Sequence, residues 1–99
     1  MPAGLLLEFE GATQQEYDAV NQDLGIDMKT GKGDWPPGLR SHTAGLSEDG
    51  VLVVTEVWDS QEHQQRFMEQ RLGPALEKAA LPPPRRLLWI DVMAHHQPA

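Results

Sequence analysis

The chain has 99 residues, no cysteine, and 15 acidic against 8 basic residues, which gives a formal net charge of −7. This length allows one domain, residues 1–99, with a thin core that gains stability from a partner. The charge disfavours nucleic acid and anionic membranes as partners, and the lack of cysteine excludes disulfides, thiolate metal sites and cysteine nucleophiles.

The N-terminal segment begins with a short apolar run. Its three leucines are closed at once by Glu8 and Glu10, and no Lys or Arg precedes them. Such a run is too short for a signal peptide or a membrane span. We therefore expect a cytoplasmic protein.

A strand and a helix are predicted next. In residues 4–10, a period of two places Leu5, Leu7 and Phe9 on one face and Leu6, Glu8 and Glu10 on the other, which is the pattern of a β-strand. Thr13 and Glu16 have the spacing of a capping box, and Gly25 supplies a stop signal, so a helix is predicted over 13–24.

Residues 25–38 form a long connection, with four glycines and two prolines and no periodicity. Connections of this length within a small domain are often lids or binding loops, and sometimes only disordered. Both interpretations remain open.

A β-hairpin is predicted from residues 39–46 and 51–58, because Asp-Gly in the segment between them is a strong turn signal. The loop length decides the register. A three-residue loop places His42 opposite Glu56, whereas a two- or four-residue loop places His42 opposite a residue of the other face. The sequence leaves this choice open.

A second helix is predicted to start at Asp59-Ser60 and to end before the prolines at 82–84. Gly73-Pro74 lies within it, so we expect a kink or a break at that point. Residues 86–94 then predict a fourth strand.

The predicted order is β-α-β-β-α-β. This is an α+β, ferredoxin-like arrangement in which two helices cover one face of a four-stranded antiparallel sheet. The strands at 51–58 and 86–94 are apolar on both faces, however, and two helices can cover only one face. We therefore expect a homodimer, with the sheet of an identical chain against the second face.

Several segments on this strand order carry a family resemblance: GLRSHTAG, VTEVWDSQE, RF, RLGPAL and PPP. The chain resembles the dimeric α/β-barrel superfamily over residues 5–93, and within it the small uncharacterised proteins near the antibiotic-biosynthesis monooxygenases. The resemblance implies a dimeric barrel. Its members include cofactor-free monooxygenases, polyketide cyclases, muconolactone isomerase and haem-degrading enzymes, and the Asn-Trp-His set of the last group is not found here.

His42 and Glu56 are the candidate catalytic residues. An imidazole in mid-strand can act as a general base or orient a substrate hydroxyl, because its pKa lies near neutrality; the alternative is a hydrogen-bonded core histidine. A carboxylate between apolar neighbours is costly to bury unless it is paired or poised for proton transfer. The alternative for Glu56 is a pair with Arg40 or Arg86.

The candidate substrate-binding residues are Tyr17, Trp35, Trp58 and Phe67. An aromatic ring in a glycine-rich loop, as at position 35, needs a docking place such as the mouth of a pocket. Trp58 offers a stacking surface, although tryptophan in a small core more often fills volume. The Tyr17 hydroxyl can point into the pocket or sit at its rim.

Asp91 and three histidines remain. Asp91 either meets an arginine at the dimer interface or lines the pocket. Adjacent His95 and His96 point to opposite sides of an extended chain, and with His63 they give no recognisable ligand spacing, so no metal is expected.

The predicted function is a cofactor-independent enzyme of the monooxygenase or cyclase kind that acts on a bulky aromatic or polyketide-like molecule and needs no cofactor. His42 would be the proton acceptor or orienting donor, and Glu56 its electrostatic partner. The alternative is a non-catalytic ligand-binding or accessory protein of a biosynthetic pathway.

Overall fold

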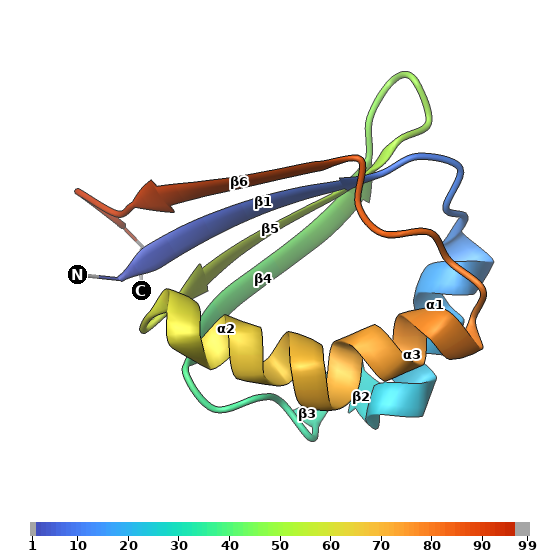
Figure 1. Cartoon of the computed structure of the whole chain (residues 1–99), viewed down its shortest axis with the longest axis horizontal. Coiled ribbons are helices and arrows are strands. Elements are labelled where there is room, and N and C mark those ends of the chain that lie inside the picture. Colours follow the sequence, from blue (N-terminus) through green and yellow to red (C-terminus); the bar gives the residue numbers. More distant parts are fainter. Residues whose placement is uncertain (1, 97–99) are drawn as a thin grey trace.

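The computed structural model describes residues 2–96 and is built on a four-stranded antiparallel sheet with its helices on one face (Figure 1). The order across the sheet is β4-β5-β1-β6. The strands are β1 (Ala3–Phe9), β4 (Leu39–Leu46), β5 (Leu52–Trp58) and β6 (Arg86–Asp91), and the helices are α1 (Gln14–Leu24), α2 (Gln61–Phe67) and α3 (Gly73–Lys78). The predicted α+β, ferredoxin-like fold is confirmed.

The fourth strand is shorter than predicted. It ends at Asp91 rather than at residue 94, because its neighbour β1 begins at Ala3 and leaves little backbone to pair with. One further bond, from the Val92 N–H to the Pro2 carbonyl oxygen (3.0 Å), extends the contact. Within residues 2–96, no helix has the length and apolarity needed to cross a membrane.

The first helix is capped as its sequence predicts. The Thr13 hydroxyl accepts from the Glu16 backbone N–H (3.2 Å), and the Glu16 carboxylate accepts from the Thr13 backbone N–H (3.0 Å). At the other end Gly25 takes the left-handed conformation (φ 76°) that glycine adopts without strain. These caps fix the helix that carries Tyr17.

The second helical segment contains a π-helical turn, η1 (Met68–Leu72), between α2 and α3. The predicted irregularity at Gly73-Pro74 is therefore present, as a widened turn. Pro74 has no N–H to donate to the preceding turn, and the Gly73 N–H donates instead to the Met68 carbonyl oxygen, five residues back. A Cβ on Gly73 would lie 2.8 Å from that oxygen, so a larger side chain would disturb the turn.

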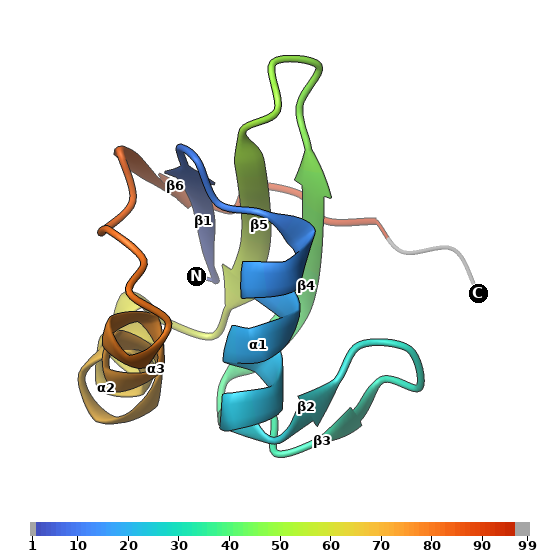
Figure 2. The same cartoon turned by 90° about the vertical axis from the view of Figure 1, so that its right-hand side faces the viewer.

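The long connection after α1 is folded rather than irregular. Two short strands, β2 (Ile26–Asp27) and β3 (Lys32–Gly33), form a ribbon that extends from the end of α1 (Figure 2). The Asp27 carboxylate accepts from the backbone N–H groups of Lys29 (2.9 Å) and Thr30 (3.4 Å), which lowers its pKa. The absence of periodicity there reflects strands too short to show any.

The sheet is apolar on both faces, as predicted. The face toward the helices carries the buried side chains Leu5, Leu7, Phe9, Leu52, Val54 and Trp58. The other face carries Leu6, Val53, Val57, Leu88 and Ile90, and Ile90 is 56% exposed. Ile90 lies over Gly4, where a Cβ would come within 2.7 Å of it.

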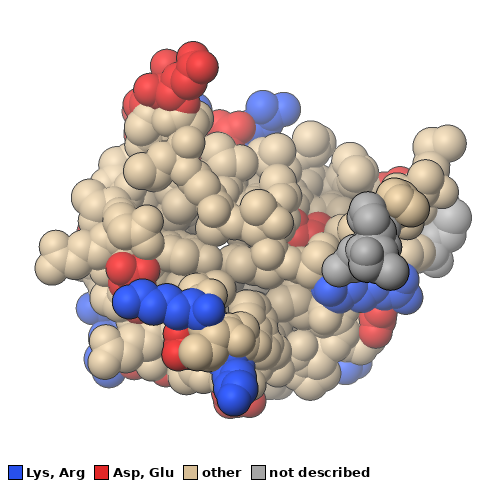
Figure 3. Space-filling model, turned by 180° about the vertical axis from the view of Figure 1, so that it is seen from behind, with Lys and Arg blue, Asp and Glu red and all other residues tan. Residues whose placement is uncertain are grey.

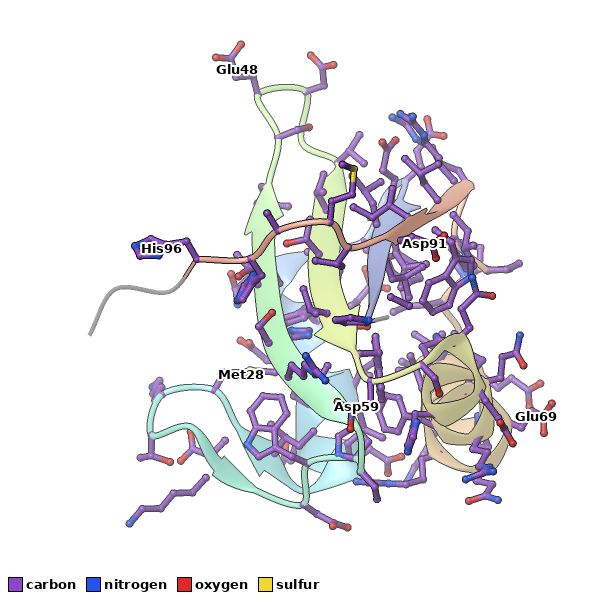
Figure 4. All side chains as sticks on the ribbon, turned by 90° about the vertical axis from the view of Figure 1, so that its left-hand side faces the viewer. Met28, Glu48, Asp59, Glu69, Asp91 and His96 are labelled. Atoms are coloured by element: carbon purple, nitrogen blue, oxygen red, sulfur yellow. The ribbon has the colours of Figure 1, made fainter. Side chains whose placement is uncertain are left out.

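Charged side chains lie mostly at the margins of the surface seen in Figure 3, where the acidic β4–β5 loop projects at the upper corner. Glu48, labelled in Figure 4, is at the tip of that loop. The loop is far from the helical layer, and it carries none of the candidate site residues.

Candidate functional site

The β4–β5 hairpin places His42 directly opposite Glu56. The Ser47 N–H donates to the Val51 carbonyl oxygen (2.9 Å), which leaves a three-residue loop, 48–50, and Gly50 in this loop has φ 80°. Of the registers left open by the sequence, this is the one that brings imidazole and carboxylate to the same face of the sheet.

Four side chains form a continuous hydrogen-bonded chain. The His42 Nδ1 lies 2.7 Å from Glu56 Oε2, and the Trp58 indole N–H donates to Glu56 Oε1 (3.0 Å). On the other side of the ring, His42 Nε2 lies 2.7 Å from the Tyr17 hydroxyl oxygen. An ionised carboxylate can only accept, so with Glu56 ionised His42 Nδ1 carries the proton and Nε2 accepts from the Tyr17 hydroxyl.

This set of hydrogen-bonded side chains is largely shielded from water. The side chain of Glu56 is 8% exposed and that of His42 is 15% exposed. Burying a carboxylate is costly unless donors surround it. The two donors, from His42 and Trp58, offset that cost and hold the carboxylate in one orientation.

The hydrogen-bonded side chains border a cavity between the sheet and the helices, and this cavity has a free volume of about 60 Å³. Four polar side chains line it: Tyr17, Asn21, His42 and Glu56. The rest of the lining is apolar and comes from the sheet, the helices and the 25–38 segment. It includes Phe9, Val20, Met28, Trp35, Phe67 and Leu76; Met28, labelled in Figure 4, belongs to the turn between β2 and β3.

Burial raises the pKa of the Tyr17 phenol above its ordinary value of 10.0. The Asn21 side-chain amide, one helical turn further along α1, acts in the opposite direction, and the charge of Glu56 raises the pKa further. The hydroxyl therefore keeps its proton at neutral pH and is able to donate to His42.

Three of the four predicted substrate-binding residues line the cavity: Tyr17, Trp35 and Phe67. The Trp35 ring lies 6.0 Å from the His42 ring, and its indole N–H donates to the Gly31 carbonyl oxygen (2.9 Å). Trp58 has a different place. It is fully buried, does not line the cavity, and packs against Phe67 at a ring distance of 5.8 Å.

The alternative pairs for Glu56 do not form. Arg40 pairs with Asp59 at 2.5 Å, and Arg86 pairs with Glu8 at 3.4 Å. Asp91, labelled in Figure 4, is exposed on β6 and does not line the cavity. Within residues 2–96, no three His, Asp or Glu side chains gather in the way that would hold a metal ion.

Asn21 is the polar residue of the cavity lining that sequence reasoning missed. It is 7% exposed and lines the cavity beside Tyr17. A signal was present in the sequence, because Asn21 lies on the same face of the helix as Tyr17 and Leu24. A polar residue on an otherwise apolar helix face is unusual and indicates a special role.

No family model matches the chain, and no curated protein matches its sequence. Solved structures do match its fold. A Chloroflexus aurantiacus protein provisionally assigned as an antibiotic biosynthesis monooxygenase is 16% identical, with a TM-score of 0.67 and coverage of 98% of both chains. A protein of unknown function from Nitrosomonas europaea is 18% identical, with a TM-score of 0.68 and coverage of 99% of this chain and 95% of the other.

A third match is a Streptomyces coelicolor monooxygenase whose structure holds the ligand nanaomycin D. It is 19% identical, with a TM-score of 0.55 and coverage of 99% of this chain and 91% of the other. At such identities the likeness establishes the fold and not the activity. The chain therefore has the ferredoxin-like fold of the antibiotic biosynthesis monooxygenase-like proteins.

Proposed function

We propose that the chain is a cofactor-independent enzyme of the monooxygenase or cyclase kind, which removes a proton from a bulky aromatic or polyketide-like substrate. The observation that carries the proposal is the hydrogen-bonded chain from Tyr17 through His42 to Glu56 at the wall of an apolar cavity. The Streptomyces coelicolor monooxygenase of the same fold is in complex with the ligand nanaomycin D, which supports a small-molecule ligand for this fold.

The proton moves from the substrate to His42. His42 Nε2 is occupied by the Tyr17 hydroxyl, so the substrate proton passes to the Tyr17 oxygen while the phenol proton passes to Nε2. Because burial raises the pKa of Tyr17, a free phenolate is disfavoured and the two transfers are coupled. Glu56 stabilises the imidazolium that results.

The electron pair left on the substrate then reacts. In a monooxygenase it passes to molecular oxygen, so the substrate loses two hydrogens and gains one oxygen atom while the second oxygen atom leaves as water. In a cyclase it attacks a carbonyl carbon of the same molecule. A carbon–carbon bond forms, the π bond of that carbonyl breaks, and its oxygen takes up the proton that His42 received. Either reaction benefits from the dry lining of the cavity.

The free volume of about 60 Å³ is small beside the about 300–1,000 Å³ of typical ligand pockets. A bulky substrate therefore needs the 25–38 segment to move, since this segment contributes Met28, Trp35 and Pro36 to the lining. We propose that the segment is a lid. Arg71 links it to the end of α1, because its guanidinium donates both to the Asp34 carbonyl oxygen in the segment (2.7 Å) and to the Leu24 carbonyl oxygen of α1 (2.9 Å).

The same small volume supports a second candidate function, a ligand-binding or accessory protein without turnover. In that case the hydrogen bonds that join Tyr17, His42 and Glu56 serve only to stabilise the core. The two functions differ in whether a bound acidic ligand exchanges its proton.

The uncovered face of the sheet supports a homodimer. Leu6, Val53, Val57, Leu88 and Ile90 form an apolar surface there, and a soluble protein rarely leaves such a surface open to water. We propose that a second copy of the chain covers it across a two-fold axis, as in the dimeric α/β barrels.

The test uses anthrone, a tricyclic aromatic ketone with an acidic methylene group. The expected result is oxygen uptake and formation of anthraquinone faster than in buffer, with the rate lost in the His42→Ala variant. Oxygen uptake and methylene deuterium exchange both equal to those of buffer would reject the enzyme and favour the accessory protein.

A further inference from the structure

The Asn21 side chain carries a buried donor without a well-formed hydrogen bond. Its amide nitrogen, Nδ2, is inaccessible to solvent and makes no hydrogen bond of good geometry with any described residue; the Tyr17 hydroxyl, whose pKa the amide lowers, is the group nearest to serving as a partner. Among the buried side-chain nitrogen and oxygen atoms of residues 2–96, it is the one without such a hydrogen bond. A buried donor left unsatisfied costs about 1–3 kcal/mol, and native proteins contain few such groups.

Folding alone would favour a different residue here. Asn21 lies in the interior of α1 among the buried side chains Val20 and Leu24. Leucine has nearly the same shape, a higher helix propensity and no polar atoms to desolvate. The asparagine is therefore a worse choice for stability on two separate grounds, and its weak interaction with Tyr17 compensates only in part.

The position of Asn21 indicates where the rest of the compensation comes from. Its side chain lines the same cavity as Tyr17 and His42, and it is one helical turn from Tyr17, where side chains on one face are neighbours. We infer that Asn21 is a ligand-binding residue, whose side-chain amide donates a hydrogen bond to a carbonyl oxygen of the molecule that occupies the cavity. The inference rests on the proposed function only in taking this cavity as the ligand site.

The charges around the cavity narrow the class of ligand. Among residues 2–96, no Lys or Arg lines it, and Glu56 does. A carboxylate or phosphate on the ligand would face a buried negative charge with no cation to balance it. A neutral carbonyl oxygen needs only a neutral donor, which is what the amide supplies.

Asn21 and Tyr17 together also indicate which polar group of the ligand faces which residue. Tyr17 donates its proton to His42 and so keeps lone pairs with which to accept, whereas Asn21 offers a donor. The pair therefore fits a molecule that carries an acidic hydrogen beside a carbonyl group, with the acidic hydrogen toward Tyr17 and the carbonyl oxygen toward Asn21. A hydrogen bond to that oxygen stabilises the negative charge that forms when the proton leaves.

The experiment compares two probes of nearly equal shape. Acetophenone has a carbonyl oxygen and ethylbenzene does not, and the affinity of each is measured by chemical-shift titration with the wild-type chain and with Asn21→Leu. The expected result is a loss of about 5- to 10-fold in acetophenone affinity in Asn21→Leu, the effect of one neutral hydrogen bond, and no loss for ethylbenzene. The melting temperature of Asn21→Leu should be equal to or above that of the wild type.

Val20→Ala is the matched control, because Val20 precedes Asn21 on α1 and lines the cavity with apolar atoms alone. It should change the affinity for both probes by the same factor. Equal losses for both probes in Asn21→Leu, a lowered melting temperature with unchanged acetophenone affinity, or no binding of acetophenone to the wild type would each overturn the inference. Only binding is measured, so the outcome does not depend on proton transfer, which the anthrone reaction tests separately.

Discussion

The imidazole of His42 on β4 and the carboxylate of Glu56 on β5 are cross-strand partners joined by a 2.7 Å contact between Nδ1 and Oε2. The hairpin holds them in register, and Trp58 fixes the second carboxylate oxygen from within the core. The orientation of the imidazole is thus set by the backbone pairing and by the buried Glu56 carboxylate, which a fully buried indole holds in turn.

His42→Ala should lower both stability and turnover. Loss of the ring leaves the buried Glu56 carboxylate with the Trp58 N–H as its donor, which should reduce the free energy of unfolding by about 1–3 kcal/mol. Loss of a general base should reduce anthrone turnover about 100-fold or more. Denaturant unfolding and oxygen uptake on the same variant measure the two effects.

His42→Asn is the control for this prediction. Its amide can still donate to Glu56, so it should recover part of the stability, but it cannot take up a proton and should not recover turnover. If turnover instead follows stability in both variants, His42 has a structural role only.

The Tyr17 phenol should lose its proton at a higher pH than an ordinary tyrosine. It is the one tyrosine in the sequence, so phenolate absorbance reports on it alone. Burial raises its pKa above 10.0 in the folded chain. A folded-state pKa above the unfolded value stabilises the protein fully at pH values below 10.0, and this contribution is lost as the pH rises through the folded-state pKa.

The titration midpoint of the native chain should therefore lie at higher pH than that of the denatured chain. Tyr17→Phe should show no phenolate signal and should lose less stability in alkali than the wild type. A native midpoint at or below the denatured one would contradict the burial of the phenol.

The apolar outer face predicts a dimer that one charge can break. Ile90→Lys should give the mass of one chain in light scattering at micromolar concentration, where the wild type gives twice that mass, because the new ammonium would be buried against the partner sheet. Leu87→Lys is the matched control. Leu87 is also exposed (50%), but it points to the other face of β6 and should leave the dimer intact. A monomeric wild type would remove the dimer proposal.

Arg71→Ala should loosen the 25–38 segment. Arg71 donates to the carbonyl oxygen of Asp34 in this segment and to that of Leu24 at the end of α1. It also pairs with the Asp34 carboxylate at 3.3 Å and lies over the Phe67 ring at 5.3 Å. Amide hydrogen exchange in the segment should become faster, and acetophenone should associate faster. Arg66→Ala removes another arginine of the same helical layer, one that pairs with the exposed Glu62, and should change neither rate. An unchanged exchange rate in Arg71→Ala would show that Arg71 does not hold the 25–38 segment in place.

Much of the fold follows from short-range patterns. The alternation in 4–10, the capping box at Thr13 and the Asp-Gly turn each specify local structure without help from the rest of the chain, and all three are present. The end of β6 does not follow in this way. A strand ends where its neighbour ends, and the neighbour is nearly the whole chain away in sequence.

The site was predicted in part, for the same reason. His42, Glu56, Tyr17, Trp35 and Phe67 could be selected as residues of unusual chemistry in their surroundings, but whether His42 and Glu56 meet depends on a single residue of loop length. The role of Trp58 depends on which way its indole turns once the core has packed. The polar stripe position of Asn21 becomes informative only when the cavity beside it is known.

The π-helical turn at Met68–Leu72 has a consequence for how relatives of this chain can diverge. Phe67 and Leu72 both line the cavity although they are five positions apart, a spacing that in an uninterrupted α-helix separates two side chains by about 140° around the axis. The widened turn accommodates one residue more than an α-helical turn. A homologous chain with a one-residue deletion here can keep both flanking helices in place while it turns one of these side chains away from the ligand. Insertions and deletions at this turn are therefore a route by which a lineage can change the shape of the cavity and leave the sheet unaltered.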